Sequence, residues 1–412
     1  MPTYSVIPQS SYDKTKSGAI LKYVNSFAVS NKRTSIEYFG RLLAFEQFIN
    51  ENYDFTVDDL VINKIFSVDI YDLLSSFVTW LSSRTDKDGN KLLSPVSIKN
   101  RVINVKNLLE YYDIAINPHK FKLRVKLPRV HNQYKEALIR EDIIKILETC
   151  ESYKLKTYLI LLAVTGLRAS EACSIRLKDI DHNNHKINIR ADFTKTKVGR
   201  YCFMTYELEN FLKIWIDYKY RRRRLKVDNV GSRWVIPNRI DDDLVFSSSF
   251  TRDGSVLSMQ KTNKKHKKID KRDLVGNLYN TMVIEFNDLL RQLDVGYEDN
   301  AKKRHIFTLH SFRRYVRTLI SDLGYQDFAE WTLGHSYSTY WRKSEKEKYA
   351  LFKKIEPHLM LLDQTSLRRQ GADMQTRLEA MERENQELRI DRGRLGSRLD
   401  KLEELYQKLD IT

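Results

Sequence analysis

The sequence predicts a mainly α-helical protein with a helical N-terminal domain, a mixed α+β domain that holds a small antiparallel sheet, and a C-terminal coiled coil. Apolar residues recur at three- and four-residue spacing along most of the 412 residues, which include only 14 Gly and 7 Pro. Two short β-rich stretches flank a polar turn near the middle of the chain, and a seven-residue apolar repeat occupies its end. The expected parts are residues 1–116, a linker at 117–137, then 138–363, and a tail at 364–412.

The N-terminal domain has helical spacing from about residue 18 to residue 113. Its apolar residues form three runs, and the turn-forming segment 86–90 (DKDGN) separates the second run from the third. Lys99 and Lys106 lie seven residues apart on the third predicted helix, so they share a face away from its apolar stripe. This face is either simply solvated or contacts phosphate groups, and the sequence leaves both interpretations open.

The next region begins as a basic stretch and then combines helices with a hairpin. Residues 117–134 contain two prolines and five Lys or Arg but no acid, which indicates an extended linker. Residues 186–190 and 200–204 are rich in strand-forming residues and predict a β-hairpin, whereas residues 221–272 read as polar, basic and irregular. Helices are expected near residues 139–147, 155–164, 208–220, 278–293, 311–323 and 328–333.

The tail carries a strict heptad repeat. Leu or Met occupies every seventh position from Leu367 to Leu409 without a miss. A core helix rarely keeps this spacing over such a length, so the repeat predicts a coiled coil. Asn385 stands at an inner position, where a buried polar residue favours a dimer. Gly393 and Gly396 each weaken the helix by about 1 kcal/mol, which keeps open the alternative of a helix that packs on the catalytic region.

The net charge points to a polyanionic partner. Lys and Arg number 71 and Asp and Glu number 54, which gives a net charge of +17. The tail from Thr365 has as many acidic as basic residues, so the whole excess lies in the preceding domains. Such a field suits a phosphate backbone, although ribosomal and membrane-surface proteins are also basic.

Cysteine usage and hydropathy indicate a soluble cytoplasmic protein without a membrane partner. Its three cysteines, Cys150, Cys173 and Cys202, are too few and too scattered for a disulfide framework or a zinc knuckle. Residues 1–16 lack the apolar core of a signal peptide. No stretch reaches the roughly 18 uninterrupted apolar residues of a membrane-spanning helix.

The first motif of chemical interest is TGLRASEA at residues 165–172, directly after a strongly apolar helix. It holds Arg168 three residues before Glu171. A planar, always-charged guanidinium so close to a core is a poor choice for packing alone. An ion pair with Glu171 and no further role is the structural alternative.

Two further motifs follow far downstream. In LHSFRR, His310 and Arg313 are three residues apart and share one face of a predicted helix. The sequence LGH ends at His335, five residues before Tyr340. Taken singly, His310 as a helix N-terminal cap and His335 as an ordinary loop residue are the structural alternatives.

In this order, and after a basic helical domain, the three motifs resemble the tyrosine recombinase (lambda-integrase-like) family. The resemblance covers residues 138–363, and the helical module before them is similar to the core-binding domain of that family. It implies a site-specific DNA recombinase or integrase. Such an enzyme cleaves and rejoins DNA strands through a 3′-phosphotyrosine intermediate, with no metal and no other cofactor.

The resemblance also implies roles for the site residues. Arg168 and Arg313 would clamp the nonbridging oxygens of the scissile phosphate and neutralise the charge that grows in the transition state. His310 and His335 would hydrogen-bond the phosphate, and His310 would also help to deprotonate the nucleophile. Lys195 matches best the lysine that protonates the leaving 5′-oxygen.

Tyr340 is the expected nucleophile, although its spacing departs from the family pattern. In most members the tyrosine lies a few residues further beyond the LGH motif, where this chain has Ser344. Tyr337 and Tyr349 are the other tyrosines nearby. Tyr340 is preferred because a basic residue, Arg342, follows it two places on, as in the family.

Other basic residues have less specific interpretations. Lys197 is the reserve for Lys195, and either lysine is at home as an exposed residue of a Thr- and Lys-rich turn. Arg221 and Arg222 open a run of four arginines that is expected to contact DNA phosphates without reading the sequence.

The expected partners are double-stranded DNA and further copies of the chain, as a coiled-coil dimer and as a tetramer on DNA. A type IB topoisomerase uses the same residue types but relaxes DNA as a monomer, so it is the nearest alternative. A DNA-binding protein that has kept the fold and lost cleavage is the alternative from another class. A purely structural coiled-coil protein would explain only the tail.

Overall fold

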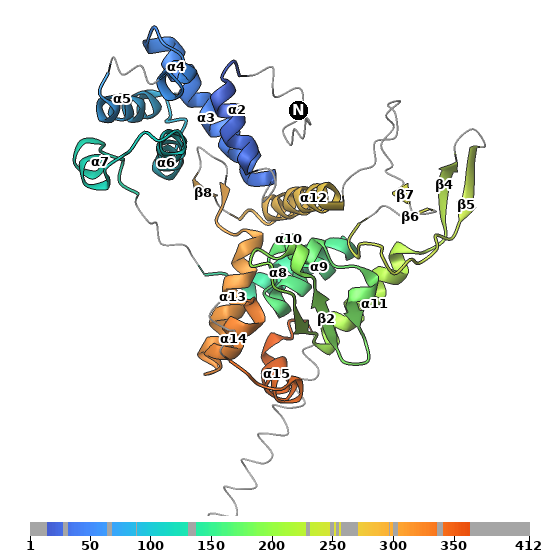
Figure 1. Ribbon diagram of the computed structural model, residues 1–412. Helices are drawn as coiled ribbons and strands as arrows, with labels where there is room; N and C mark the ends of the chain where they lie inside the picture. Colours follow the sequence, from blue (N-terminus) through green and yellow to red (C-terminus); the bar gives the residue numbers. More distant parts are fainter. Residues whose placement is uncertain are drawn as a thin grey trace, which may run out of the picture. The chain divides into compact units, whose positions relative to one another are not determined.

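The computed structural model consists of two compact units, residues 1–134 and residues 135–412 (Figure 1). The border between them falls inside the predicted linker. The predicted coiled coil at 364–412 lies outside the described residues. The structure describes residues 15–27, 32–63, 68–87, 89–130, 137–227, 231–247, 251–252, 255–256, 271–295, 297–299, 304–335 and 341–362.

The N-terminal unit is built from helices, as its apolar spacing predicts. Phe45, Phe77 and Leu108 are completely buried in its core, and the rings of Phe45 and Phe77 pack edge to face at 5.2 Å. The Ser94 hydroxyl accepts a hydrogen bond from the backbone of Ser97 and so caps the last long helix. The helices are α2 (Gly18–Ser26), α3 (Lys32–Asn52), α4 (Val57–Val61), α5 (Ile70–Ser83), α6 (Pro95–Tyr111) and α7 (Pro118–Arg124).

Helix α7 corrects the interpretation of residues 117–134 as a wholly extended linker. The Asn117 side chain caps its first turn, where Pro118 fits without losing a hydrogen bond. Phe121 and the buried Val125 pack against the core of the N-terminal unit. The proline and the density of basic residues concealed a short helix that is stabilised by packing on its neighbours.

The second unit combines helices with a small sheet. Its helices are α8 (Arg140–Thr149), α9 (Tyr153–Thr165), α10 (Ala169–Cys173), α11 (Tyr206–Lys219), α12 (Lys271–Gln292), α13 (Leu309–Asp322), α14 (Gln326–Leu333) and α15 (Glu345–Leu359). Its strands are β1 (Ile180–Asp181), β2 (Lys186–Ile189), β3 (Arg200–Phe203), β4 (Arg223–Val227), β5 (Gly231–Val235), β6 (Thr251–Arg252), β7 (Ser255–Val256), β8 (Tyr297–Asp299) and β9 (Arg304–His305).

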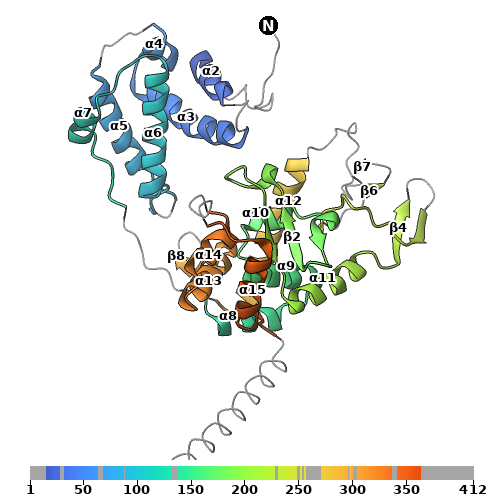
Figure 2. The ribbon, with the colours of Figure 1, turned by 60° about the horizontal axis from the view of Figure 1, so that its bottom comes forward.

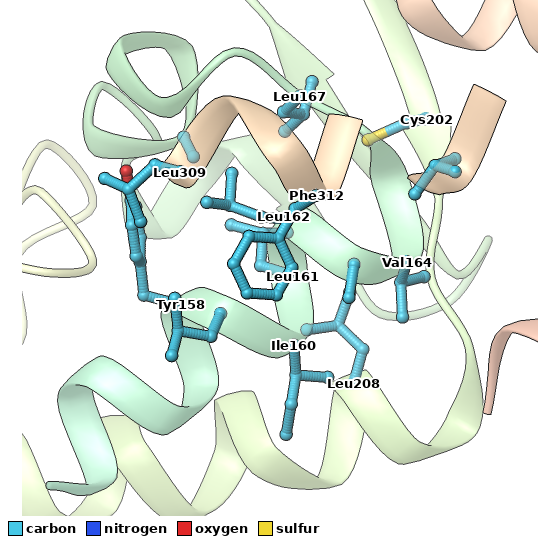
Figure 3. Close-up of a cluster of buried hydrophobic side chains, with 14 of the residues drawn as sticks. Tyr158, Ile160, Leu161, Leu162, Val164, Leu167, Cys202, Leu208, Leu309 and Phe312 are labelled. Atoms are coloured by element: carbon cyan, nitrogen blue, oxygen red, sulfur yellow. The ribbon is translucent and has the colours of Figure 1, made fainter. Parts of the chain in front are cut away.

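Helix α9 is the centre of this unit. All its residues from Thr157 to Thr165 are buried, which explains its almost continuous apolar sequence. Figure 3 shows the ring of Phe312 from α13 against Leu161 and Leu162 of α9. Helices α11 and α13 both pack on α9. The core therefore holds α13 and the turn after α9 in a fixed relation.

The predicted hairpin is confirmed and gains a third strand. Strands β1, β2 and β3 form an antiparallel sheet in that order, with Ile187 opposite Cys202 and Ile189 opposite Arg200. By contrast, the span 221–272 is not wholly irregular, because β4 and β5 pair as an antiparallel hairpin. Its few apolar residues stand among arginines, so charge obscured the alternation that forms a strand.

Helix α15 was not predicted from the sequence. It begins with a capping box in which the Ser344 hydroxyl accepts from the backbone of Glu347 and the Glu347 carboxylate accepts in return. In both views α13, α14 and α15 gather at one end of the second unit (Figures 1 and 2). Over the described ranges, the structure contains no helix that is both long and apolar enough to cross a membrane.

Candidate active site

Arg168 lies at the turn between α9 and α10, and a glycine shapes this turn. Helix α9 ends at Gly166, whose φ of 61° is in the left-handed region. A Cβ atom there would lie 2.6 Å from Cδ2 of Leu333 and 3.2 Å from Cβ of Val316, so only glycine fits against α13 and α14. Arg168 follows as the N-cap residue of α10, and 25% of its side chain remains exposed. The turn thus fixes Arg168 near α13 and leaves it accessible.

A buried carboxylate holds Arg168. Glu171 is completely buried, and its Oε1 accepts a hydrogen bond from Nη1 of Arg168 at 2.8 Å. Arg200, the first residue of β3, donates through Nη2 to Oε2 of Glu171 at 2.6 Å. Burial alone would raise the pKa of Glu171, but the hydrogen bonds and charges of the two arginines outweigh it and hold the pKa below its ordinary value. Glu171 is therefore a carboxylate shared by two arginines.

Arg313 is buried on the inner face of α13, with only 4% of its surface exposed. It donates through Nη1 to the carbonyl of Gly166 at 2.8 Å and through Nη2 to the carbonyl of Leu333 at 2.7 Å. Burial lowers the pKa of Arg313 to about 10, and the nearby charge of Arg168 is the next cause. Because this value is far above 7, Arg313 remains a cation at neutral pH. Arg168 and Arg313 thus place two positive charges close together.

His335 is oriented from both sides. Gly334 ends α14 in the left-handed region, with φ of 69°, and turns the chain so that His335 follows directly. Nη2 of Arg313 donates to Nε2 of His335 at 3.0 Å, while Nδ1 of His335 donates to the carboxylate of Glu330. Arg317 donates to the other oxygen of Glu330 at 2.7 Å. These bonds select the tautomer with the proton on Nδ1.

His310 lies in the first turn of α13 and is exposed. The partial burial of its ring lowers the pKa of His310, and so do the positive charges of Arg313 and Arg314. The positive charge of Arg168 adds to the same effect. The helix is capped by Thr308 and not by His310. His310 is thus a neutral imidazole beside both arginines at neutral pH.

The structure does not bring Lys195 to the arginines. Lys195 and Lys197 lie on the exposed connection between β2 and β3. Lys197 adopts a φ of 57° and its Nζ donates to the carbonyl of Asp192 at 3.5 Å. Over the described residues, no contact joins either lysine to Arg168 or Arg313.

The tyrosine candidates are placed only in part. Tyr340 and Tyr337 lie outside the described residues. Tyr349 is half-buried in α15, where its ring packs against Phe203 at 5.3 Å and Phe352 at 6.5 Å. This environment is that of a packing residue.

The residue after Tyr340 is firmly attached to α14. The ring of Trp341 lies 6.0 Å from each of the rings of Phe328 and Trp331. The ammonium group of Lys348 lies 4.7 Å from the Trp331 ring and 5.7 Å from the Trp341 ring. These contacts form an aromatic cage, defined here as Trp331, Trp341 and Lys348 with Tyr201 beside them.

The four basic residues expected to contact DNA are at the surface, and some of them interact with neighbouring side chains. Lys99 is exposed on α6, whereas Lys106 forms an ion pair with Glu110 at 3.3 Å. Arg221 and Arg222 are exposed after α11. The guanidinium of Arg221 stacks on the ring of Tyr218 at 3.5 Å.

Comparison with known proteins identifies the family. The model of the phage integrase family matches residues 136–340. Tyrosine recombinase XerA of Saccharolobus solfataricus is 30% identical over 202 residues, which cover 44% of this chain and 66% of that protein. The chain belongs to the tyrosine recombinase family. A second relative is tyrosine recombinase XerD of Rickettsia bellii, which is 30% identical over 128 residues that cover 28% of this chain and 42% of that protein.

Two solved structures of integrases share the fold of this tyrosine recombinase. A lambda integrase dimer bound to a COC′ core site superposes with a TM-score of 0.50 at 14% identity, over 79% of this chain and 97% of that one. The Tn1549 transposon integrase in complex with transposon right end DNA gives 0.50 at 17% identity, over 82% and 98%. The chain spans at most about two thirds of the curated relatives XerA and XerD.

Sequence reasoning missed two residues that organise this recombinase site. Arg200 belongs to no motif, and only its place at the start of a strand, five residues after Lys195, hints at it. Glu330 stands five residues before His335 on a helix, a spacing that gave no signal. Both act through other side chains, and such roles become visible only when the tertiary contacts are known.

The stability of the fold should depend on pH through the carboxylate of Glu171, which Arg168 and Arg200 share. Because the pKa of folded Glu171 lies below its unfolded value of about 4.3, its charge stabilises the fold above that pH. This contribution is lost as the pH falls through the folded pKa. The free energy of unfolding, measured with urea at pH 6 and pH 4, should therefore decrease less toward pH 4 in Glu171→Gln than in the wild type. Glu148→Gln, at an exposed site of α8, is the matched control. An equal decrease of the free energy of unfolding between pH 6 and pH 4 in all three proteins would contradict the prediction.

Proposed function

We propose that this chain is a site-specific DNA recombinase that cleaves and rejoins DNA strands through a covalent 3′-phosphotyrosine. The observation that carries the proposal is the convergence of Arg168 and Arg313 from separate elements, with His310 and His335 beside them. Two guanidiniums with imidazole rings beside them suit a phosphodiester whose charge grows during the reaction. Arginines can supply this charge themselves, so the proposed reaction requires no metal cofactor.

In the proposed reaction Tyr340 is the nucleophile. Its oxygen bonds to the phosphorus as the bond from phosphorus to the 5′-oxygen breaks. His310 accepts the tyrosine proton, which its lowered pKa allows because the ring is neutral at pH 7. Lys195, or Lys197 in its place, gives a proton to the leaving 5′-oxygen. Attack by a second strand's 5′-hydroxyl reverses these steps and releases the tyrosine, so no other reagent is consumed.

The arginines have separate parts in this reaction. Arg313 is held by two carbonyls and His335, so its position does not depend on the substrate. Arg168 is one quarter exposed and is the arginine more open to incoming DNA. Together they clamp the nonbridging oxygens, and His335 keeps the Arg313 guanidinium in place beside them.

Double-stranded DNA is the proposed partner. The excess charge lies outside the tail, and Lys99, Lys106, Arg221 and Arg222 are proposed to contact phosphates. Lys106 would then exchange its ion pair with Glu110 for a phosphate, at small cost because the pair is at the surface. The lambda and Tn1549 integrases named above were both solved with DNA, one of them as a dimer. We extend this partner to the present chain, together with assembly as a tetramer on DNA.

The proposed division of labour follows the chain. The N-terminal unit, including α7, grips DNA as a core-binding domain, residues 138–363 carry out catalysis, and residues 364–412 join protomers. The part of the linker 117–137 that follows α7 connects the first two.

Trapping of a covalent intermediate tests the proposed function. Duplexes from candidate sites carry a nick beside the cleavage position, so that the short cleaved fragment diffuses away and rejoining fails. A protein–DNA adduct that survives denaturation supports the proposal. Binding to all duplexes without any adduct favours a DNA-binding protein without cleavage. Relaxation of supercoiled plasmids that lack any specific site, by a monomer, favours a type IB topoisomerase.

The tail is proposed to form a parallel, two-stranded coiled coil between protomers. The Leu and Met ladder supplies its seam, and three flanking pairs have opposite charges: Arg377 with Glu382, Glu384 with Arg389, and Arg398 with Glu403. Sedimentation of the full chain should show a dimer that Leu388→Pro converts to monomers, whereas Arg369→Ala before the charged pairs should not. A monomer in the unaltered chain would refute this assembly.

A further inference from the structure

Arg200 is almost completely enclosed, with 8% of its side chain exposed, although it carries a permanent charge. Nη2 donates to Glu171 at 2.6 Å and Nε donates to the carbonyl of Thr332 at 3.4 Å. Arg200 therefore links strand β3 to α10 and to the end of α14. A charge is retained at such a buried position only where its bonds are useful or its loss is costly.

The end of α14 is shaped to receive this side chain. A Cβ atom on Gly334 would lie 2.7 Å from Cδ and Nε of Arg200 and 2.8 Å from its Cζ. The guanidinium thus lies directly on the backbone that precedes His335. Any side chain at residue 334 would displace Arg200, so the glycine and the arginine are a matched pair.

Arg200 also determines how Glu171 can bind Arg168. A carboxylate and a guanidinium tend to form two parallel hydrogen bonds when both are free to do so. Here Arg200 occupies Oε2 of Glu171, together with the backbone N–H of Arg168, and only Oε1 accepts from the Arg168 side chain. Nη1 of Arg168 is thereby engaged, and Nη2 and Nε make no hydrogen bond with Glu171.

We propose that Arg200 is a positioning residue. It keeps Glu171 from binding the Arg168 guanidinium with both carboxylate oxygens, and so leaves Nη2 and Nε of Arg168 to bind the scissile phosphate. This inference rests on the proposed function. Without Arg200, the buried carboxylate of Glu171 would have Arg168 as its single cationic partner. It would then bind the Arg168 guanidinium through two parallel hydrogen bonds. The site would keep Arg168 and Arg313 and its fold, but Arg168 would face away from the DNA.

The expected effect of Arg200→Met is slower adduct formation at nearly unchanged DNA affinity. We expect a loss on the order of 10- to 100-fold, as when a group that orients a metal ligand is removed. Arg200→Lys keeps the charge near Glu171 and should be less impaired, so it serves if the methionine variant folds poorly. Arg190→Met is the matched control, because Arg190 lies on the neighbouring strand end and pairs with the buried Asp179, not with Glu171.

A double-mutant cycle with Arg168→Lys separates positioning from general destabilisation. If Arg200 acts through Arg168, Arg200→Met should slow the Arg168→Lys protein far less than it slows the wild type. Equal slowing in both backgrounds, or an Arg190→Met variant as slow as Arg200→Met, would overturn the proposal.

A second readout is independent of activity. The Nε–H resonance of Arg168, assigned through its loss in Arg168→Lys, should shift in Arg200→Met and stay in place in Arg190→Met. If the wild-type chain forms no adduct on any duplex, the proposed function fails and this resonance alone decides about Arg200. An unshifted resonance in Arg200→Met would refute the positioning role.

Discussion

Tyr340→Phe should abolish the covalent protein–DNA adduct and leave DNA binding unchanged. The substitution removes one oxygen, the atom that is proposed to bond to phosphorus, and keeps the ring. Adduct formation on nicked duplexes and a binding titration on intact ones measure the two effects. Adduct formation should also persist in EDTA, since arginines and not a metal ion are proposed to bind the phosphate.

Two other tyrosines provide the controls for this experiment. Tyr349→Phe should be nearly silent, because the Tyr349 ring packs between Phe203 and Phe352 and phenylalanine preserves those contacts. Tyr337→Phe should likewise retain the adduct. Persistence of the adduct in Tyr340→Phe, together with its loss in either other variant, would transfer the role of nucleophile to that residue.

Arg168→Ala and Arg313→Ala should each slow cleavage by two to three orders of magnitude while affinity for DNA falls only modestly. Each removes a donor whose bonds matter most in the transition state, and loss of one such donor costs about 3–4 kcal/mol. Single-turnover rates and equilibrium binding on the same duplex separate the two effects. Equal losses of rate and affinity would instead identify the arginines as contacts of the ground state.

The two arginine variants should differ in stability. Arg313 is buried and its removal leaves the carbonyls of Gly166 and Leu333 without their donor, so Arg313→Ala should also unfold more easily. Arg168 is partly exposed, but its loss leaves the buried Glu171 with Arg200 as its remaining cation. Arg313→Lys retains a charge and serves to separate the loss of the guanidinium geometry from the loss of folding.

Most of the fold could be predicted because its signals are local. The apolar run at 155–164 identified α9, and the strand-rich stretches around residue 195 identified the β2–β3 hairpin. The errors fell where local and tertiary preferences disagree. Basic residues concealed α7 and the β4–β5 hairpin, and α15 has a charged first turn that does not resemble a core helix.

The candidate site could be predicted where a residue type is itself informative. Arginine and histidine at fixed spacing pointed to Arg168, His310, Arg313 and His335. A hydrogen bond joins Arg313 to His335, and electrostatic effects link Arg313 to Arg168 and both arginines to His310. Lys195 remains a prediction, because spacing along a hairpin does not determine where a flexible lysine points. The part played by Arg200 depends on a carbonyl and a glycine that are more than a hundred residues away, which no sequence pattern reports.

The segment that contains the proposed nucleophile is anchored at both of its ends. His335 is fixed by Arg313 at one end of residues 336–340, and Trp341 is fixed by α14 rings at the other. At about 3.3–3.6 Å per residue, the backbone between these anchors can extend no further than roughly 20 Å. Substitution of Trp341 by alanine would remove the ring contacts with Phe328 and Trp331 and so release one of these two anchors.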